Sequence, residues 1–158
     1  MSSLPSPPIS RLLGRFGGLS NRDRTLLAEA VFWLALSRIA LKVCPFRVIA
    51  ARLGAFSAPT QTAAGDIELS QEQLRVARTV GWSVTRAARY VPFRAVCLPQ
   101  AIAAKMMLRR RHVPSVLHFG VAIIAGGPLK AHAWLDAADV QVTGFPIAPE
   151  FVETARFV

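Results

Sequence analysis

Residues 97–136 read CLPQAIAAKMMLRRRHVPSVLHFGVAIIAGGPLKAHAWLD, and this stretch decides the fold. Its first part predicts a helix that ends near Arg111. Pro99 suits the first turn of that helix, where its missing N–H removes no hydrogen bond. The apolar residues recur at helical spacing and are candidates for a buried face: Ala101, Ile102, Met106 and Leu108.

The second part of the stretch is β-like after Pro114. Residues 116–124 and 129–136 predict two strands on either side of a Gly-Gly-Pro turn at 126–128, and residues 140–143 predict a short third strand. Helices followed by an antiparallel meander indicate an α+β fold.

Upstream of this stretch, the chain predicts further helices. Asn21 or Asp23 is placed to cap a helix from about 24 to 39. Residues 46–53 predict a second helical segment, and Gly54 suits the position just beyond its end.

The next segment predicts a loop and a long helix. Residues 55–69 contain few aliphatic side chains and are expected to form the loop. Ser70 then reads as an N-cap, and Gln73 three positions later completes a capping-box pattern. The apolar positions that follow predict a helix over about 71–90, and Pro92 ends it.

The length of the chain predicts one domain. It has 158 residues, of which 53% are hydrophobic, which suffices for a core and excludes a disordered chain. Residues 1–20 are rich in Ser, Pro and Gly and predict a flexible or extended arm. We therefore expect a single domain over 21–158, with an N-terminal helical part over 24–53.

The net charge and the hydropathy of the chain indicate which partners and which cellular compartment to expect. The chain has 19 Lys and Arg residues and 9 Asp and Glu residues, which gives a net charge of +10. The field of such a charge attracts acidic peptides, phosphates or anionic surfaces. No nucleic-acid partner is expected, because the arginines are spread over several helices without a recognition motif. The longest apolar stretch, 30–36, is far shorter than the roughly 20 residues of a transmembrane segment. With no secretory signal and only two cysteines, we expect a cytoplasmic protein with reduced thiols.

Cys97 and His132 are the candidate catalytic residues. Cys97 stands at the start of a predicted helix, whose unpaired N–H groups favour a thiolate and can face a developing oxyanion. His132, in Ala-His-Ala-Trp on a later strand, is suited to take the thiol proton and return it to a leaving amine. Either residue alone is more often a packed or surface side chain, but their order and setting predict a nucleophile and its base.

A metal site is the competing interpretation of these side chains. It would combine Cys97 with His112, His118 and His132. No C-x-x-C or H-x-x-x-H spacing supports it, so we expect neither a metal nor another cofactor.

Several stretches carry a resemblance that extends over roughly residues 30–145. They are CLPQA at 97–101, LRRRHVP at 108–114, Gly120-Val121 and AHAWLD at 131–136, preceded by AARYVPFR at 87–94 and by the helical segment at 34–46. Together they resemble the transglutaminase-like leader peptidases of lasso peptide biosynthesis.

The resemblance implies a papain-like or transglutaminase-like cysteine peptidase fold, with a catalytic helix packed on a small antiparallel sheet. Cys97 matches the family nucleophile and His132 its base. Such proteins remove the leader from a ribosomally made precursor peptide. A separate leader-binding protein delivers the precursor, and an ATP-using cyclase then closes the macrolactam.

The third member of a triad does not carry over. The family commonly places an Asp about twelve residues after the His, where this chain reads Val-Thr-Gly at 142–144. If the turn centres on 137–138, facing residues have numbers that sum to about 275. His132 then faces Thr143, or Gly144 after a slip of one residue.

The carboxylates near this place are poorly positioned. Asp136 lies roughly 13 Å along the same strand at ~3.3 Å per residue, and Asp139 falls in the turn. Asp136, Asp139 and Thr143 therefore remain candidates to orient His132. A backbone carbonyl, a water molecule or Glu150 from the tail are alternatives.

Two further residues are substrate-binding candidates. Gln100 lies one helical turn beyond the cysteine, and Trp134 shares a strand face with His132. The alternative for Gln100 is a surface or capping amide, and for Trp134 a core side chain that also shields the site.

Other functions of the same fold remain open. A non-catalytic adaptor could hold a peptide in a basic groove, and an acyl transferase could pass the acyl group to an amine instead of water. The Cys–His pair favours the peptidase, whereas the missing acid favours the adaptor.

Overall fold

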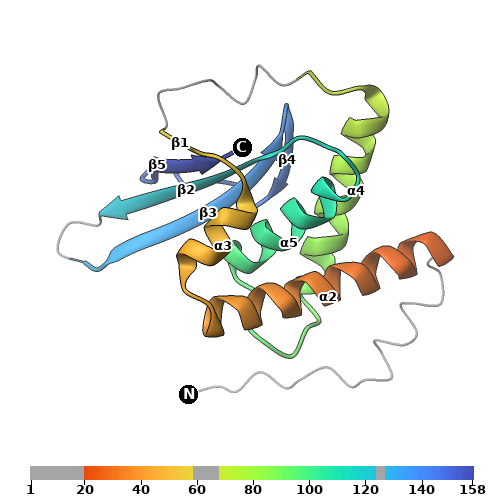
Figure 1. Cartoon of the computed structure of the whole chain (residues 1–158), viewed down its shortest axis with the longest axis horizontal. Helices are drawn as coiled ribbons and strands as arrows, with labels where there is room; N and C mark the ends of the chain where they lie inside the picture. Colours follow the sequence, from red (N-terminus) through yellow and green to blue (C-terminus); the bar gives the residue numbers. More distant parts are fainter. Residues whose placement is uncertain (1–19, 59–67, 124–126) are drawn as a thin grey trace.

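The structure is a computed structural model that describes residues 20–58, 68–123 and 127–158. The predicted arm lies outside the described residues apart from Ser20, as do residues 59–67 and residues 124–126 of the predicted turn. Helices pack on one side of a five-stranded sheet, and α5 lies between the sheet and α2 (Figure 1). The predicted α+β fold is confirmed.

Helix α2 (Asn21–Val43) begins earlier and ends later than predicted. Its N-cap is Ser20, and the prediction of Asn21 or Asp23 was wrong. Ser20 accepts a hydrogen bond from the Asp23 backbone N–H, and the Asp23 carboxylate accepts one in return. Asp23 is thus the N3 residue of a capping box.

The other helices follow their local signals closely. Helix α3 (Phe46–Leu53) ends before Gly54, as predicted. Helix α4 (Gln71–Ala88) has the predicted capping box between Ser70 and Gln73. Helix α5 (Cys97–Arg109) begins at the cysteine.

The sheet has the order β1-β5-β2-β3-β4, and every pairing is antiparallel. The hairpin of β2 (Val116–Ile123) and β3 (Leu129–Ala137) and the short β4 (Val140–Thr143) match the prediction. Strands β1 (Phe56–Ser57) and β5 (Val152–Phe157) were not predicted. Because β5 inserts between β1 and β2, the sheet is more than a simple meander.

The register between β3 and β4 corrects the predicted one. Ala137 pairs with Val140, so Ala138 and Asp139 form the turn, and Ala138 has a φ of 49°. After a register shift Leu135 pairs with Thr143. The prediction that His132 faces Thr143 was therefore wrong, whereas the alternative residue, Gly144, does contact the His132 ring through its carbonyl oxygen.

The two faces of β3 meet different surroundings. Ala133 and Leu135 belong to the hydrophobic core that also contains α5 residues. Because side chains alternate along a strand, His132, Trp134 and Asp136 lie on the other face.

Candidate active site

Cys97 is the first residue of α5 and its thiol is free and half-buried. The N-cap is Val96, whose side chain makes no capping hydrogen bond. The Val96 side chain therefore does not cap the first N–H groups of α5, and the positive end of the helix dipole is available to an anion. This is a suitable place for a thiolate nucleophile and for an oxyanion.

His132 is held by the backbone of Gly144. Its Nε2 lies 2.7 Å from the Gly144 carbonyl oxygen. A carbonyl oxygen only accepts hydrogen bonds, so Nε2 carries the proton and the neutral ring keeps its lone pair at Nδ1. The Phe151 ring at 5.2 Å and the Trp134 ring at 6.0 Å flank the imidazole. This arrangement leaves Nδ1 as the basic atom.

Gly144 stands where the resembling family commonly has its acid. Its φ is 85°, which L side chains rarely adopt. A Cβ at this position would lie 2.5 Å from the Ala133 carbonyl oxygen and 2.8 Å from the Trp134 Cα. The local backbone therefore requires glycine, and it offers a carbonyl in place of a carboxylate.

The thiol and the imidazole are not joined by a hydrogen bond in the part of the chain that the structure describes. Helix α5 packs against β3, but His132 lies on the face of the strand away from the core. Strand β4 pairs only with residues 135–137 of β3, and directly after β4 Gly144 packs against the β3 backbone at Ala133 and Trp134.

The other residues considered for orienting His132 lie elsewhere. Asp136 Oδ2 lies 3.0 Å from His118 Nε2. Asp139 is exposed in the β3–β4 turn, and Glu150 is exposed in the segment before β5. Thr143 is buried, and its Oγ1 has no hydrogen-bond partner among the described residues.

The two substrate-binding candidates have structural contacts. Gln100 Nε2 donates a hydrogen bond of 2.6 Å to the Ala95 carbonyl oxygen, which fixes the segment before Cys97. Trp134 is 7% exposed and stacks on His118 at 5.3 Å, with the rings almost parallel at 2°.

A buried charge network, unforeseen from the sequence, lies beneath Trp134. His118 Nδ1 lies 2.8 Å from Glu153 Oε1, and Arg156 Nε donates to the same oxygen at 2.9 Å. The contact with Asp136 is at ion-pair distance but lacks the angle of a hydrogen bond. Burial opposes the charged ring, but the contacts with Asp136 and Glu153 and their negative charges outweigh it and raise the pKa of His118.

The comparison with protein families gives one match. The model of the transglutaminase-like superfamily matches residues 40–154. The chain belongs to the transglutaminase-like superfamily. The searches of curated proteins and of solved structures found no match.

As a member of the transglutaminase-like superfamily, the chain fits a role of the cysteine peptidase or acyl transferase type. In the described ranges, no group of three or more His, Cys, Asp or Glu side chains is placed to hold a metal ion. Likewise, none of the described helices is long and apolar enough to cross a membrane.

Proposed function

We propose that the chain is a cysteine peptidase that removes the leader from a ribosomally synthesised lasso peptide precursor. The hydrogen bond from His132 Nε2 to the Gly144 carbonyl carries this proposal, because it leaves Nδ1 free to act as a base. The start of α5 at Cys97 and the superfamily membership support it.

The reaction would proceed in two steps. His132 Nδ1 takes the Cys97 proton, and the thiolate attacks the scissile carbonyl while the N–H groups at the start of α5 stabilise the oxyanion. The C–N bond breaks, and the imidazolium gives its proton to the leaving amine. Water, deprotonated by His132, then cleaves the thioester and releases the acid and the free thiol.

A bound peptide would have to bring the thiol and the imidazole together. The ladder of β4 ends at Leu135, and Gly144 occupies the edge of β3 at Ala133 and Trp134, so a bound peptide would reach this edge only beyond them, beside residues 129–132. Catalytic hydrogen bonds are often long without substrate and shorten when it binds.

A separate leader-binding protein would deliver the precursor, and a macrolactam-forming cyclase would use the product. No cofactor is needed, because the thiol and imidazole supply all the proton and acyl transfers. The two free thiols, Cys44 and Cys97, suit a reducing compartment, and we propose that the reaction takes place in the cytoplasm.

The decisive experiment compares Cys97→Ala with the wild type. The purified protein is mixed with the precursor and the leader-binding protein that neighbouring reading frames encode, and the products are measured by mass spectrometry. We expect the wild type to release the leader and Cys97→Ala to release none while retaining its melting temperature. Cys44→Ala is the matched control and should cleave normally. Cleavage by Cys97→Ala at the wild-type rate would disprove the peptidase.

A non-catalytic adaptor is the second candidate, and one observation favours it: no hydrogen bond links Cys97 and His132 in the described structure, and His132 lies on the face away from the core. An adaptor would bind the precursor equally well with and without Cys97 and would release nothing. An acyl transferase would yield a product that lacks the added water, which the same mass measurement detects.

A further inference from the structure

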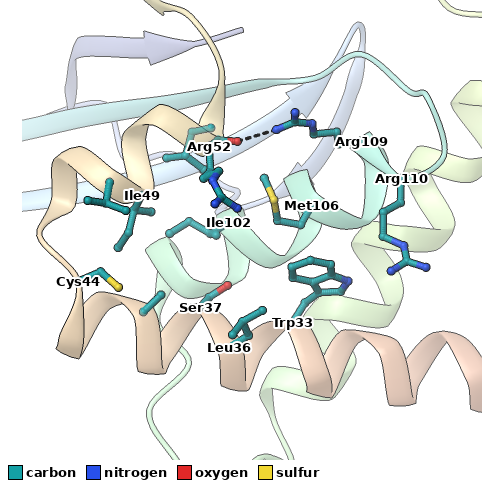
Figure 2. A pocket seen from close by; sticks show the side chains of 13 residues that line it. Trp33, Leu36, Ser37, Cys44, Ile49, Arg52, Ile102, Met106, Arg109 and Arg110 are labelled. Carbon is teal, nitrogen blue, oxygen red and sulfur yellow. Dashed lines mark hydrogen bonds between the residues drawn. The ribbon is translucent and has the colours of Figure 1, made fainter.

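A pocket of about 690 Å³ lies between α2, α3 and α5, away from the start of α5 (Figure 2). Arg109, at its rim, is the last residue of α5, and Cys97 is the first. At 1.5 Å per residue the two are roughly 18 Å apart along the helix axis. The pocket therefore lies outside the candidate active site.

The pocket combines an apolar lining with one unsatisfied polar group. Most of its lining is aliphatic or aromatic, including Leu36, Ile49, Ile102 and Met106. Ser37 is 4% exposed, lines the pocket, and its hydroxyl has no hydrogen-bond partner among the described residues. Figure 2 shows its oxygen directed into the space between α2 and α5. An unpartnered buried hydroxyl is costly, so this group favours an occupant with a polar atom.

The charged residues that line the pocket are all arginines: Arg52, Arg109 and Arg110. Arg109 donates a hydrogen bond of 2.9 Å to the Arg52 carbonyl oxygen, which holds its guanidinium at the mouth of the pocket. Arg110 Nε lies 3.7 Å from Glu29 Oε1, outside the lining. Because no lining residue is acidic, Arg52 and Arg109 still attract negative charge to the mouth.

Helix α2 continues this surface with an apolar stripe that faces outward. We call Phe32, Leu36, Ile39 and Val43 the outer stripe; they are 57%, 42%, 56% and 71% exposed. Their spacing aligns them along one side of the helix. The opposite side of α2 is buried through residues such as Leu34. A helix that is apolar on both sides is typically covered by protein on both sides. Leu36 belongs to the outer stripe and also lines the pocket, so the two surfaces are continuous.

We propose that the outer stripe and the pocket together dock an acidic amphipathic helix of a partner protein. The apolar side chains of that helix would cover the stripe and enter the pocket, and its carboxylates would pair with the arginines at the mouth. From Phe32 to Val43 the stripe is roughly 16 Å long, which matches three turns of a partner helix.

The other possible occupants fit less well. A second copy of this chain carries a charge of +10, and residues 1–20 contain arginines but no Asp or Glu, so both would be repelled by the arginines. A single fatty carboxylate could fill the pocket but would leave the outer stripe exposed.

The test uses full-length Cys97→Ala protein, so that its result does not depend on peptidase activity. A display library of random peptides about 16 residues long is selected against it, and an enriched peptide is labelled for fluorescence anisotropy. We expect enriched sequences with Leu, Ile or Phe on one helical face and Asp or Glu beside them. Leu36→Asp and Arg109→Glu should each weaken binding at least tenfold, on the order of 1.4 kcal/mol.

Two substitutions on α4 serve as controls. Trp82→Asp changes another exposed apolar residue and Arg78→Glu another exposed arginine, and both should bind within about twofold of the parent. Circular dichroism checks each fold. If the Leu36→Asp protein unfolds, binding by the Arg109→Glu protein alone decides the test, because the Arg109 side chain is exposed and its replacement should not unfold the protein.

Four results would overturn the proposal. The enriched peptides could lack acidic residues, or they could bind the Leu36→Asp or Arg109→Glu protein as tightly as the parent. Light scattering could reveal a dimer that Leu36→Asp dissociates, which would assign the surface to self-association. Finally, dodecanoate could bind stoichiometrically when no acidic peptide is enriched, which would assign the pocket to a lipid.

Discussion

At Gly144 a backbone carbonyl accepts the Nε2 proton of His132 at 2.7 Å, at the place where the resembling leader peptidases commonly carry an acid. A neutral acceptor fixes the tautomer of the ring as a carboxylate does, but it stabilises the imidazolium less. The pair Cys97 and His132 is therefore expected to be a weaker catalyst than a full triad.

Gly144→Asp tests whether the acid can be restored. We expect release of the leader to fall rather than rise and stability to drop by about 1–3 kcal/mol, because the new Cβ would meet the Ala133 carbonyl and the φ of 85° is strained. Urea unfolding and leader release measure the two effects. Gly144→Ala should lose as much stability, since it adds the same Cβ. Faster release by Gly144→Asp would contradict this account.

The sequence led to Cys97 and His132 because both stand in distinctive local contexts. It also raised a carbonyl among the groups that could orient His132. Which carbonyl this is depends on the register shift between β3 and β4, and local patterns carry no information on that shift. The contact of Asp136 with His118 depends equally on the pairing of β2 with β3.

At the scale of elements, the capping box of α4 gives a direct test. Ser70 Oγ accepts the Gln73 backbone N–H at 3.2 Å, and Gln73 Nε2 also donates to the His112 carbonyl beyond α5. Ser70→Ala should cost about 1 kcal/mol of unfolding free energy, measured by urea titration. Ser70→Asp is the matched control and should retain most of the unfolding free energy that the cap contributes. No loss in Ser70→Ala would mean that the cap is unimportant.

The strands β2, β3 and β5 share the His118 network, which predicts a pH dependence. The folded pKa of His118 is raised above its ordinary 6.5, so the network stabilises the protein fully below that pH. This contribution is lost as the pH rises through the raised value. We expect the wild type to lose stability as the pH rises above 6.5 and through the raised pKa of His118.

His118→Gln should remove this dependence, because the amide cannot titrate. The measurement is the unfolding free energy of both proteins across the same pH range. If the variant and the wild type show the same pH profile, His118 is not the responsible group.

Helices and strands that neighbouring residues in the sequence specify were predicted, and those that depend on contacts between residues distant in sequence were not. The capping box marked the start of α4, and Pro99 marked the first turn of α5. Strand β5 was missed because Glu153 and Arg156 are charged residues in a largely covered strand. They are accommodated there by each other and by His118, a partner that is distant in sequence.

At the scale of the whole molecule, Lys105 links the central helix α5 to the chain just before β2 and to the end of β5. It is 5% exposed, and its Nζ donates to the carbonyl oxygens of Ser115 at 2.7 Å and Phe157 at 3.1 Å. Burial, with a smaller effect of Arg109, lowers its pKa from 10.5 to about 8. The folded protein thus loses this proton more readily than the unfolded chain does.

This depression predicts that the unfolding free energy rises as the pH increases from about 8 towards 10.5, since the unfolded state binds more protons there. Lys105→Met should flatten the profile over that range, whereas Lys130→Met, at an exposed position, should leave it unchanged. Urea unfolding at several pH values is the measurement. A wild-type profile that falls over this range would contradict the prediction.

The geometry at Gly144 also has an evolutionary consequence. A single substitution at this position cannot supply an acid without strain, because the new side chain meets the Ala133 carbonyl and Trp134. The neighbouring chain would first have to move apart. Descendants of this chain would therefore gain an acid for His132 more readily at another position than at residue 144.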